Sequence, residues 1–439
     1  MNNIQERWKT SKSYRGFLIA AIIYAVLRLA MQVYLFSDAL RPGVSAEETQ
    51  VSADLQRSYI PAAQHFRAHE DIYLKGSLKV LEDHFPYSPA FAFFFGPILL
   101  LPLNILVPLL VILHIAAYWL LYIWWDRIFQ KNNLENVAKM WAGVLPLFLV
   151  FSAFWDDLGY LNIYLLIALL ATFAIDAVMQ EKLGWAVLWL AVILSIKPHW
   201  AFALALPLLI GNYRFFFKLL AGAIVVYLLI AGVTILAGGV SYGIQQYKDY
   251  IGFLARLSRD FPWRGPDAPF LGYDQSVKQT FLYYFGISTL TLKIVTILKV
   301  ALLIPLGWIS VKFLRLPQER RQAIKSETKL ALAFAFYLGA FIWLDNVWEI
   351  SLGLVVFAYF LATTEKKWAV ISLWILFAPY ALVDIWRLVT YIIFGDDILY
   401  QGAYLLTDPI LYIPWITAII LGFYTLSLKK LNAFLNQTA

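Results

Sequence analysis

Apolar residues fall in long continuous blocks along this chain, and the length of these blocks limits what the chain can fold into. Residues 16 to 36, 105 to 125 and 286 to 311 are examples, and a helix needs roughly 20 mostly apolar residues to cross the hydrocarbon of a bilayer. Because backbone amides in hydrocarbon must bond internally, such blocks are compatible only with helices. The pattern predicts an all-α integral membrane protein that forms a single polytopic membrane domain over residues 1–439.

Composition excludes several other classes. Hydrophobic residues make up 61% of the chain and charged residues 14%, and there is no Cys, so disulfides, thiolate metal sites and Cys nucleophiles are ruled out. The formal charge is +7, but most Lys and Arg lie in short segments between apolar blocks, where they orient helices. We therefore expect membrane lipids as partners and no nucleic acid. The block at 16 to 36 is too long for the core of a signal peptide and is expected to stay as an anchor.

The blocks and the polar stretches between them predict the topology. About 11 to 13 transmembrane helices are expected, with a short block at 89 to 103 as a possible re-entrant segment. Pro198 should split the block at 184 to 210 into two halves that meet at Lys197-Pro198-His199, since Pro removes a helix hydrogen bond. Three polar stretches are too long for simple turns, and function is sought there first: residues 37–86, 239–285 and 395–408.

Basic residues in short loops set the expected orientation. Lys9, Lys12 and Arg15 precede the first block, and a basic stretch at 312–329 precedes a later one; such segments remain on the cytoplasmic side. By parity the three long polar stretches share the opposite face, and helices at the membrane surface are expected there. This predicts a multi-pass protein of the cytoplasmic membrane with both termini cytoplasmic and an external site.

Several short motifs occur in a specific order. Asp54 is followed by Tyr59 and small residues, and Phe85-Pro86-Tyr87-Ser88-Pro89 leads into an apolar segment. Further along lie Leu158-Gly-Tyr-Leu-Asn162, Lys197-Pro198 and Asp274-Gln-Ser276. In this order, from about residue 16 to 363, they resemble glycosyltransferase family 87. Two positions depart from the family pattern: Tyr160 stands where Gln is usual, and Asp345-Asn-Val-Trp-Glu-Ile350 lacks a His.

The resemblance implies a GT-C glycosyltransferase fold and a transfer chemistry. A hexose, with mannose as the first candidate, would move with inversion from a polyprenyl phosphate to a lipid-linked or glycan acceptor. Such a transfer needs a carboxylate to take the proton of the acceptor hydroxyl, and Asp54 is the candidate; alternatively it caps the helix that follows. No cofactor and no metal are expected, and the donor lipid is a substrate.

Two further groups of side chains are candidates for binding. Cations should stabilise the departing lipid phosphate, and contact with anionic lipid headgroups is the alternative for those in residues 239–285. The donor-phosphate candidates are Lys197, Arg256, Arg259, Arg264 and Lys278. The acceptor or sugar candidates are Tyr59, His84, Tyr87, Asp157, Asn162, His199, Gln275 and Glu349.

Other roles stay open for some charged residues. Lys197 beside Pro198 could reach toward the headgroups, and the pair Asp156-Asp157 could mark a loop between helices. Asp384 and Arg387 are three apart, which favours an ion pair within one helix. Arg28 could reach a lipid phosphate or pair with a neighbouring helix.

Two other functions remain open. One is a secondary transporter or lipid flippase, which would hold polar residues near the bilayer midplane at broken helices; here the candidates cluster at one face. The other is a membrane scaffold without enzymatic activity, which would not need the charged side chains of the long loops.

Overall fold

A computed structural model describes residues 2–45, 48–49, 51–52, 54–73, 85–261, 263–268, 274–345, 350–394 and 409–438. These residues form helices and no strand, as the apolar blocks predict. The acidic stretch at 395–408 lies outside the described residues.

The described helices follow one another through short turns. They are α1 (Asn2–Thr10), α2 (Lys12–Leu35), η1 (Asp38–Leu40), η2 (Asp54–Tyr59), α3 (Ile60–Ala68), α4 (Pro89–Leu99), α5 (Leu103–Lys131), α6 (Glu135–Gly143), α7 (Leu145–Val150), α8 (Ser152–Tyr160), α9 (Tyr164–Met179), α10 (Leu183–Ile196), η4 (Pro198–Leu204), α11 (Ala205–Leu209), α12 (Tyr213–Ala237), α13 (Val240–Asp260), α14 (Val277–Phe285), α15 (Thr289–Arg315), α16 (Gln318–Gln322), α17 (Ser326–Trp343), α18 (Gly353–Thr363), α19 (Lys367–Ala381), α20 (Val383–Phe394) and α22 (Pro409–Thr438).

Five of the described helices are long and apolar enough to cross a membrane, or up to seven if each of two bent pairs counts as one span. The five are α2, α5, α12, α15 and residues 414–437 of α22. Helices α2, α12 and α15 leave most of their apolar side chains exposed, as expected of surfaces that face lipid. The shorter apolar helices, including α9, α10 and α18, lie inside the bundle, where most of their side chains are buried. These features indicate a multi-pass membrane protein.

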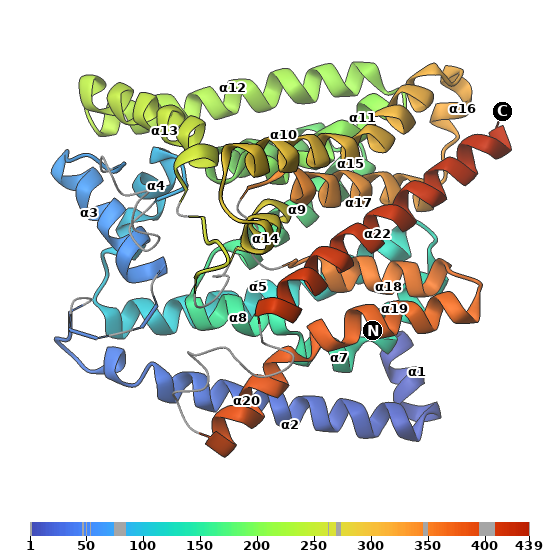
Figure 1. The fold of residues 1–439 in the computed structure, drawn as a ribbon, viewed down its shortest axis with the longest axis horizontal. Helices are drawn as coiled ribbons and strands as arrows, with labels where there is room; N and C mark the ends of the chain where they lie inside the picture. Colours follow the sequence, from blue (N-terminus) through green and yellow to red (C-terminus); the bar gives the residue numbers. More distant parts are fainter. Residues whose placement is uncertain are drawn as a thin grey trace.

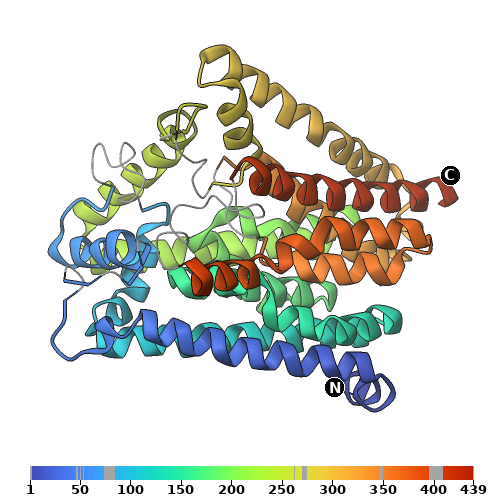
Figure 2. The same cartoon turned by 60° about the horizontal axis from the view of Figure 1, so that its bottom comes forward.

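The long helices run side by side, and both ends of the chain lie at the same end of the bundle (Figures 1 and 2). Ion pairs join the elements at this end. Lys430 of α22 binds Glu327 at the start of α17, and Lys131 at the end of α5 lies 3.2 Å from Asp176 of α9. Helices α3, α4 and α13 lie at the opposite end (Figure 1), which we call the loop end.

Residues 183–209 form a helical hairpin whose tip is Lys197. Helix α10 ends at Ile196, and Lys197 has an extended backbone with φ −137° and ψ 93°, the conformation favoured before a proline. The chain then returns as η4 and α11, so both ends of the hairpin lie at the end of the bundle that holds the termini. The predicted break at Pro198 is confirmed.

Two expectations about local structure are wrong. Asp156 and Asp157 are not in a loop: both lie in helix α8 and both are buried. Residues 239–285 are also more regular than a long polar loop, because α13 and α14 occupy much of that stretch. The segment at 89 to 103 forms α4, which packs against α3 before α5 begins.

Candidate active site

Asp54 lies at the start of η2, a wide helical turn that continues into α3 at the loop end. The Ser52 hydroxyl accepts a hydrogen bond from the Leu55 amide at 3.3 Å and donates to the carbonyl oxygen of Tyr160. These contacts fasten the start of η2 to the end of α8. The Asp54 Oδ2 atom accepts a hydrogen bond from Asn162 Nδ2 at 2.7 Å, so the fold brings together two residues that are 108 positions apart in the chain.

The orientation of the Asn162 amide is fixed by donors on its other side. Its Oδ1 atom accepts from the Tyr59 hydroxyl at 2.8 Å and from the Ile163 backbone amide at 2.7 Å. Because both partners donate, Oδ1 must face them, and the Nδ2 group is left to donate to Asp54. Asn162 therefore holds one oxygen of the Asp54 carboxylate, a role that the sequence did not assign to it.

Aromatic rings form the wall beside this pair. The hydroxyl oxygens of Tyr59 and Tyr87 are 3.0 Å apart, and the Tyr87 ring stacks on Phe91 with a centroid distance of 4.9 Å. Tyr73 donates to the carbonyl oxygen of Tyr87 at 2.6 Å. Tyr59 and Tyr87 are thus both next to the carboxylate network, as predicted for acceptor or sugar candidates.

Lys197 points into the same region from the tip of the α10 hairpin. Its Nζ atom donates to the Tyr164 hydroxyl at 2.5 Å and lies 3.8 Å from the Tyr164 ring centroid and 4.7 Å from that of Tyr87. The side chain is buried, so the alternative in which it reaches outward to the headgroups is wrong. The carboxylates of Asp54 and Asp157 both act electrostatically on this ammonium group.

Burial raises the pKa of Asp54 to about 6, while the Lys197 ammonium group and the Asn162 hydrogen bond oppose this shift. The three effects have distinct physical causes. Burial penalises the charged form, whereas a nearby cation and a donated hydrogen bond favour it. A carboxylate with a pKa near 6 is ionised at neutral pH and remains basic enough to accept a proton.

The acid side of the pH profile should report this carboxylate. If Asp54 is the base, kcat/KM for transfer falls about tenfold per pH unit below about 6, because only the ionised form accepts a proton. Initial rates at a series of pH values would measure it. In Asn162→Ala the hydrogen bond that favours the charged form is lost, so the acid limb should move to higher pH. A rate independent of pH well below 6 would contradict the assignment.

His114 and Asp157 lie behind Asn162, and the sequence analysis missed His114. The His114 Nε2 atom is 2.6 Å from the Asn162 carbonyl oxygen and 3.6 Å from Asp157 Oδ2. Asp157 Oδ2 also accepts from the Leu165 amide at 3.0 Å. The only signal in the sequence is a single ionisable residue inside an apolar span, which is costly unless it has a partner or a function.

The second long loop contributes the Asp274-Gln-Ser276 stretch. The Ser276 hydroxyl caps α14 by accepting from the Gln279 amide at 3.0 Å, and Asp274 accepts from the Ser276 amide at 2.9 Å. The Asp274 carboxylate acts electrostatically on both Tyr164 and Lys278. This stretch, in which Gln275 is buried, therefore connects the Lys197 region with the Lys278 region.

Lys278 belongs to a neighbouring charged cluster. Lys278 and Lys299 are 3.2 Å and 2.5 Å, respectively, from the two carboxylate oxygens of Asp345, and the Lys278 ammonium group lies 4.3 Å from the Trp263 ring centroid. Two cations thus share one carboxylate beside the site.

The structure does not bring all the candidates to the Asp54 site. Arg256 is exposed on α13 and donates to the Gly252 carbonyl of its own helix, while Arg264 is held through its backbone by Gln279. His199 is partly buried next to Lys197. Three candidates fall outside the description: His84 and Glu349 are outside the described residues, as is the side chain of Arg259.

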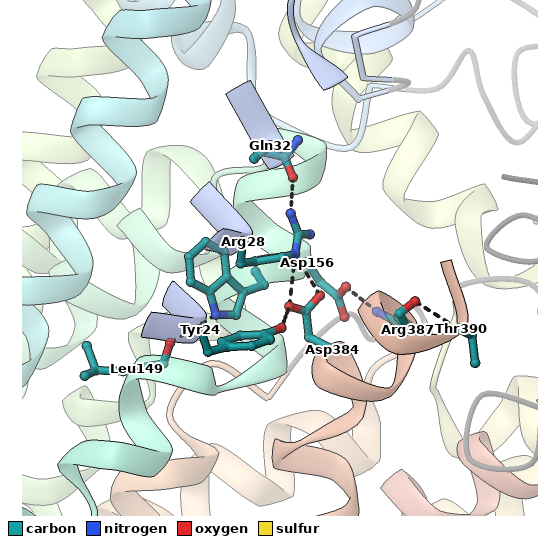
Figure 3. A network of polar contacts seen from close by, with 9 residues as sticks. Tyr24, Arg28, Gln32, Leu149, Asp156, Asp384, Arg387 and Thr390 are labelled. Carbon is teal, nitrogen blue, oxygen red and sulfur yellow. Dashed lines mark hydrogen bonds and ion pairs between the residues drawn. The ribbon is translucent and has the colours of Figure 1, made fainter. Parts of the chain in front are cut away.

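A buried network of charged groups joins α2, α8 and α20 (Figure 3). Arg28 lies 3.0 Å from Asp384, which also accepts a hydrogen bond from Tyr24, and Arg387 binds Asp156. The expected ion pair between Asp384 and Arg387 within one helix is wrong, because each residue pairs with a different helix. Arg28 has a neighbouring helix as its partner.

Metal ligation was tested by searching for clusters of ligand side chains. Within the described part of the chain, no three His, Cys, Asp or Glu residues gather closely enough to hold an ion. The absence of a metal requirement stays a prediction.

The sequence profile of glycosyltransferase family 87 matches residues 85–338, which is more than half of the chain. The chain belongs to glycosyltransferase family 87. Membership indicates glycosyltransferase activity and confirms the family that the motifs suggested. The matched range of this family 87 protein contains Tyr87, Asn162 and Lys197, whereas Asp54 precedes it. No curated protein and no solved structure matches the chain.

Proposed function

We propose that this family 87 protein transfers a hexose, with mannose as the first candidate, from a polyprenyl phosphate to a lipid-linked or glycan acceptor. The observation that carries the proposal is the Asp54 carboxylate, held by Asn162 at 2.7 Å and under the electrostatic influence of the buried Lys197 ammonium group. A base and a cation at one site are what an inverting transfer to a hydroxyl group requires.

In the proposed reaction Asp54 takes the proton of the acceptor hydroxyl. The acceptor oxygen attacks the anomeric carbon while the bond from that carbon to the donor phosphate oxygen breaks, through an oxocarbenium-like state. The electron pair stays with the polyprenyl phosphate, and attack from the opposite face inverts the configuration. Lys197 would offset the charge that develops on the departing phosphate, with the Lys278 and Lys299 cluster as a second source of positive charge.

The distribution of basic residues supports an external site in the cytoplasmic membrane. The end of the bundle that holds both termini carries basic residues in its turns, including Lys131, Lys182 and Arg214 and the stretch from Lys312 to Lys329. Short basic loops remain cytoplasmic. The loop end, with Asp54 and Lys197, would then face outward, where a lipid donor from the bilayer and an acceptor from the water side can meet.

Sugar transfer by the purified protein in lipid vesicles tests the proposal. We expect product from polyprenyl phosphate mannose with a membrane lipid extract as the acceptor pool, and none from a nucleotide-linked mannose, which lacks the lipid tail. Polyprenyl phosphates carrying other hexoses identify the sugar by comparison. If no polyprenyl phosphate sugar gives product, but the protein moves such a lipid across the bilayer, the transporter or flippase alternative replaces this proposal.

A further inference from the structure

We propose that His114 is a positioning residue for Asp54, acting as a buried imidazolium paired with Asp157 and holding the Asn162 turn in place. The inference rests on the proposed function, because it assigns a task to the Asp54 site. It concerns a residue in the middle of α5 that contacts no predicted substrate group, and whose importance the motifs do not reveal.

The surroundings of the His114 ring indicate its protonation state. Nδ1 lies 2.7 Å from the Leu110 carbonyl oxygen, and Nε2 lies 2.6 Å from the Asn162 carbonyl oxygen. Carbonyl oxygens only accept hydrogen bonds, while a neutral imidazole has a proton on one nitrogen and a lone pair on the other. A neutral ring would point its lone pair at a carbonyl oxygen, whereas an imidazolium donates to both.

Asp157 supplies the opposite charge. Its Oδ2 atom is 3.6 Å from His114 Nε2, and both side chains are about 1% exposed. A buried charge is tolerated only when it is paired and hydrogen-bonded. Asp157 Oδ2 also accepts from the Leu165 amide in the first turn of α9, where the helix dipole favours negative charge. The pair thus clamps α5, α8 and α9 together.

The clamp acts directly on the residue that holds the base. Asn162 follows α8 in a turn where Leu161 adopts a left-handed conformation with φ 48°. The Asn162 amide donates to the Asp157 carbonyl oxygen at 2.9 Å, and the Asn162 carbonyl faces His114. Since the side chain of Asn162 binds Asp54, a displacement of this turn displaces the carboxylate. Errors of about 1 Å in a reacting group can cost about 100-fold in rate.

Three variants test the clamp by activity. His114→Gln and Asp157→Asn each leave one buried charge without its partner, and each should lower kcat for transfer by roughly 10- to 100-fold with little change in the donor KM. The double variant His114→Gln/Asp157→Asn removes both charges and keeps hydrogen-bonding groups at both positions. Its kcat should exceed that of either single variant, whereas single effects that multiply would overturn the proposal. His65→Gln, a histidine change on α3, is the control with unchanged kcat.

A spectroscopic measurement decides the matter without relying on transfer. The chain has five histidines, and nitrogen-15 labelling of their rings distinguishes an imidazolium, with two protonated nitrogens, from a neutral ring with one. We expect one imidazolium signal at a pH well above the ordinary histidine pKa of about 6.5, absent from His114→Gln and converted to a neutral signal in Asp157→Asn. A neutral ring at His114 in the unaltered protein would overturn the inference. If the unaltered protein transfers no sugar, the proposed function fails while this measurement still tests the clamp.

Discussion

Asp54→Asn should lower kcat for sugar transfer by about 10²- to 10⁴-fold, the range that a positioned general base contributes. The substitution keeps the size of the side chain but removes the group that accepts the proton. The introduced amide can still face Asn162, so donor binding should change little and the loss should appear in kcat. Initial rates with saturating donor, measured for both proteins in the same lipid, give the comparison.

The folded state should tolerate this change. Burial raises the pKa of Asp54 above its ordinary value, so the ionised form is disfavoured by folding at neutral pH. A neutral amide removes that cost, and thermal unfolding should therefore occur at the same or a higher temperature. A loss of activity with intact folding would then be attributable to chemistry.

A carboxylate elsewhere in the same polar stretch provides the matched control. Asp38 lies in η1, is largely exposed and pairs with Arg41 at 3.0 Å on the surface. Asp38→Asn removes the same charge from residues 37–86 and should leave the rate unchanged. Full transfer activity in Asp54→Asn would exclude Asp54 as the base.

The sequence was informative where one physical constraint acts alone. The length of an apolar block predicts a spanning helix because backbone groups in hydrocarbon must bond within it, and α2 agrees with the block at 16 to 36 to within a few residues. Proline has no amide hydrogen and restricts the preceding residue, so the break at Pro198 could also be predicted. The order of the motifs identified the family.

The sequence was misleading where distant partners offset a local cost. Asp156-Asp157 suggested a loop because adjacent carboxylates are unfavourable in an apolar helix. The residues that compensate, Arg387 and His114, are 231 and 43 positions away from their respective partners. Such compensation cannot be read from local composition, since it depends on which helices become neighbours. His114 was missed for the same reason.

The spacing of Asp384 and Arg387 illustrates how a correct local rule can fail. Residues three apart on a helix can form an ion pair, and both residues are indeed in ion pairs. Neighbouring helices provide partners that the spacing rule does not consider: Arg28 of α2 for Asp384, and Asp156 of α8 for Arg387. The charged groups therefore connect three helices rather than stabilising one.

Asp384→Asn or Arg28→Met should each reduce the stability of the folded protein by about 3–5 kcal/mol, because each leaves a buried charge without its partner. The side chains of Arg28 and Asp384 are 9% and 3% exposed, and Arg28 is further fixed by a 2.8 Å hydrogen bond to Gln32. The Trp155 ring centroid lies 5.4 Å from its guanidinium carbon. Unfolding in mixed micelles with increasing denaturing detergent measures the loss.

The double variant Arg28→Met/Asp384→Leu separates the cost of an unpaired charge from the loss of an attraction. Replacing both members of a buried ion pair with apolar side chains is often neutral or stabilising, so the double variant should be more stable than either single variant. Asp38→Asn again serves as the control, since breaking an exposed ion pair costs about 0–1 kcal/mol. A double variant as unstable as the sum of the two single changes would show that the charges are not coupled. Asp156 in this network adjoins Asp157 in α8, so the same contacts that join α2 and α20 to α8 also support the helix that ends at the Asn162 turn.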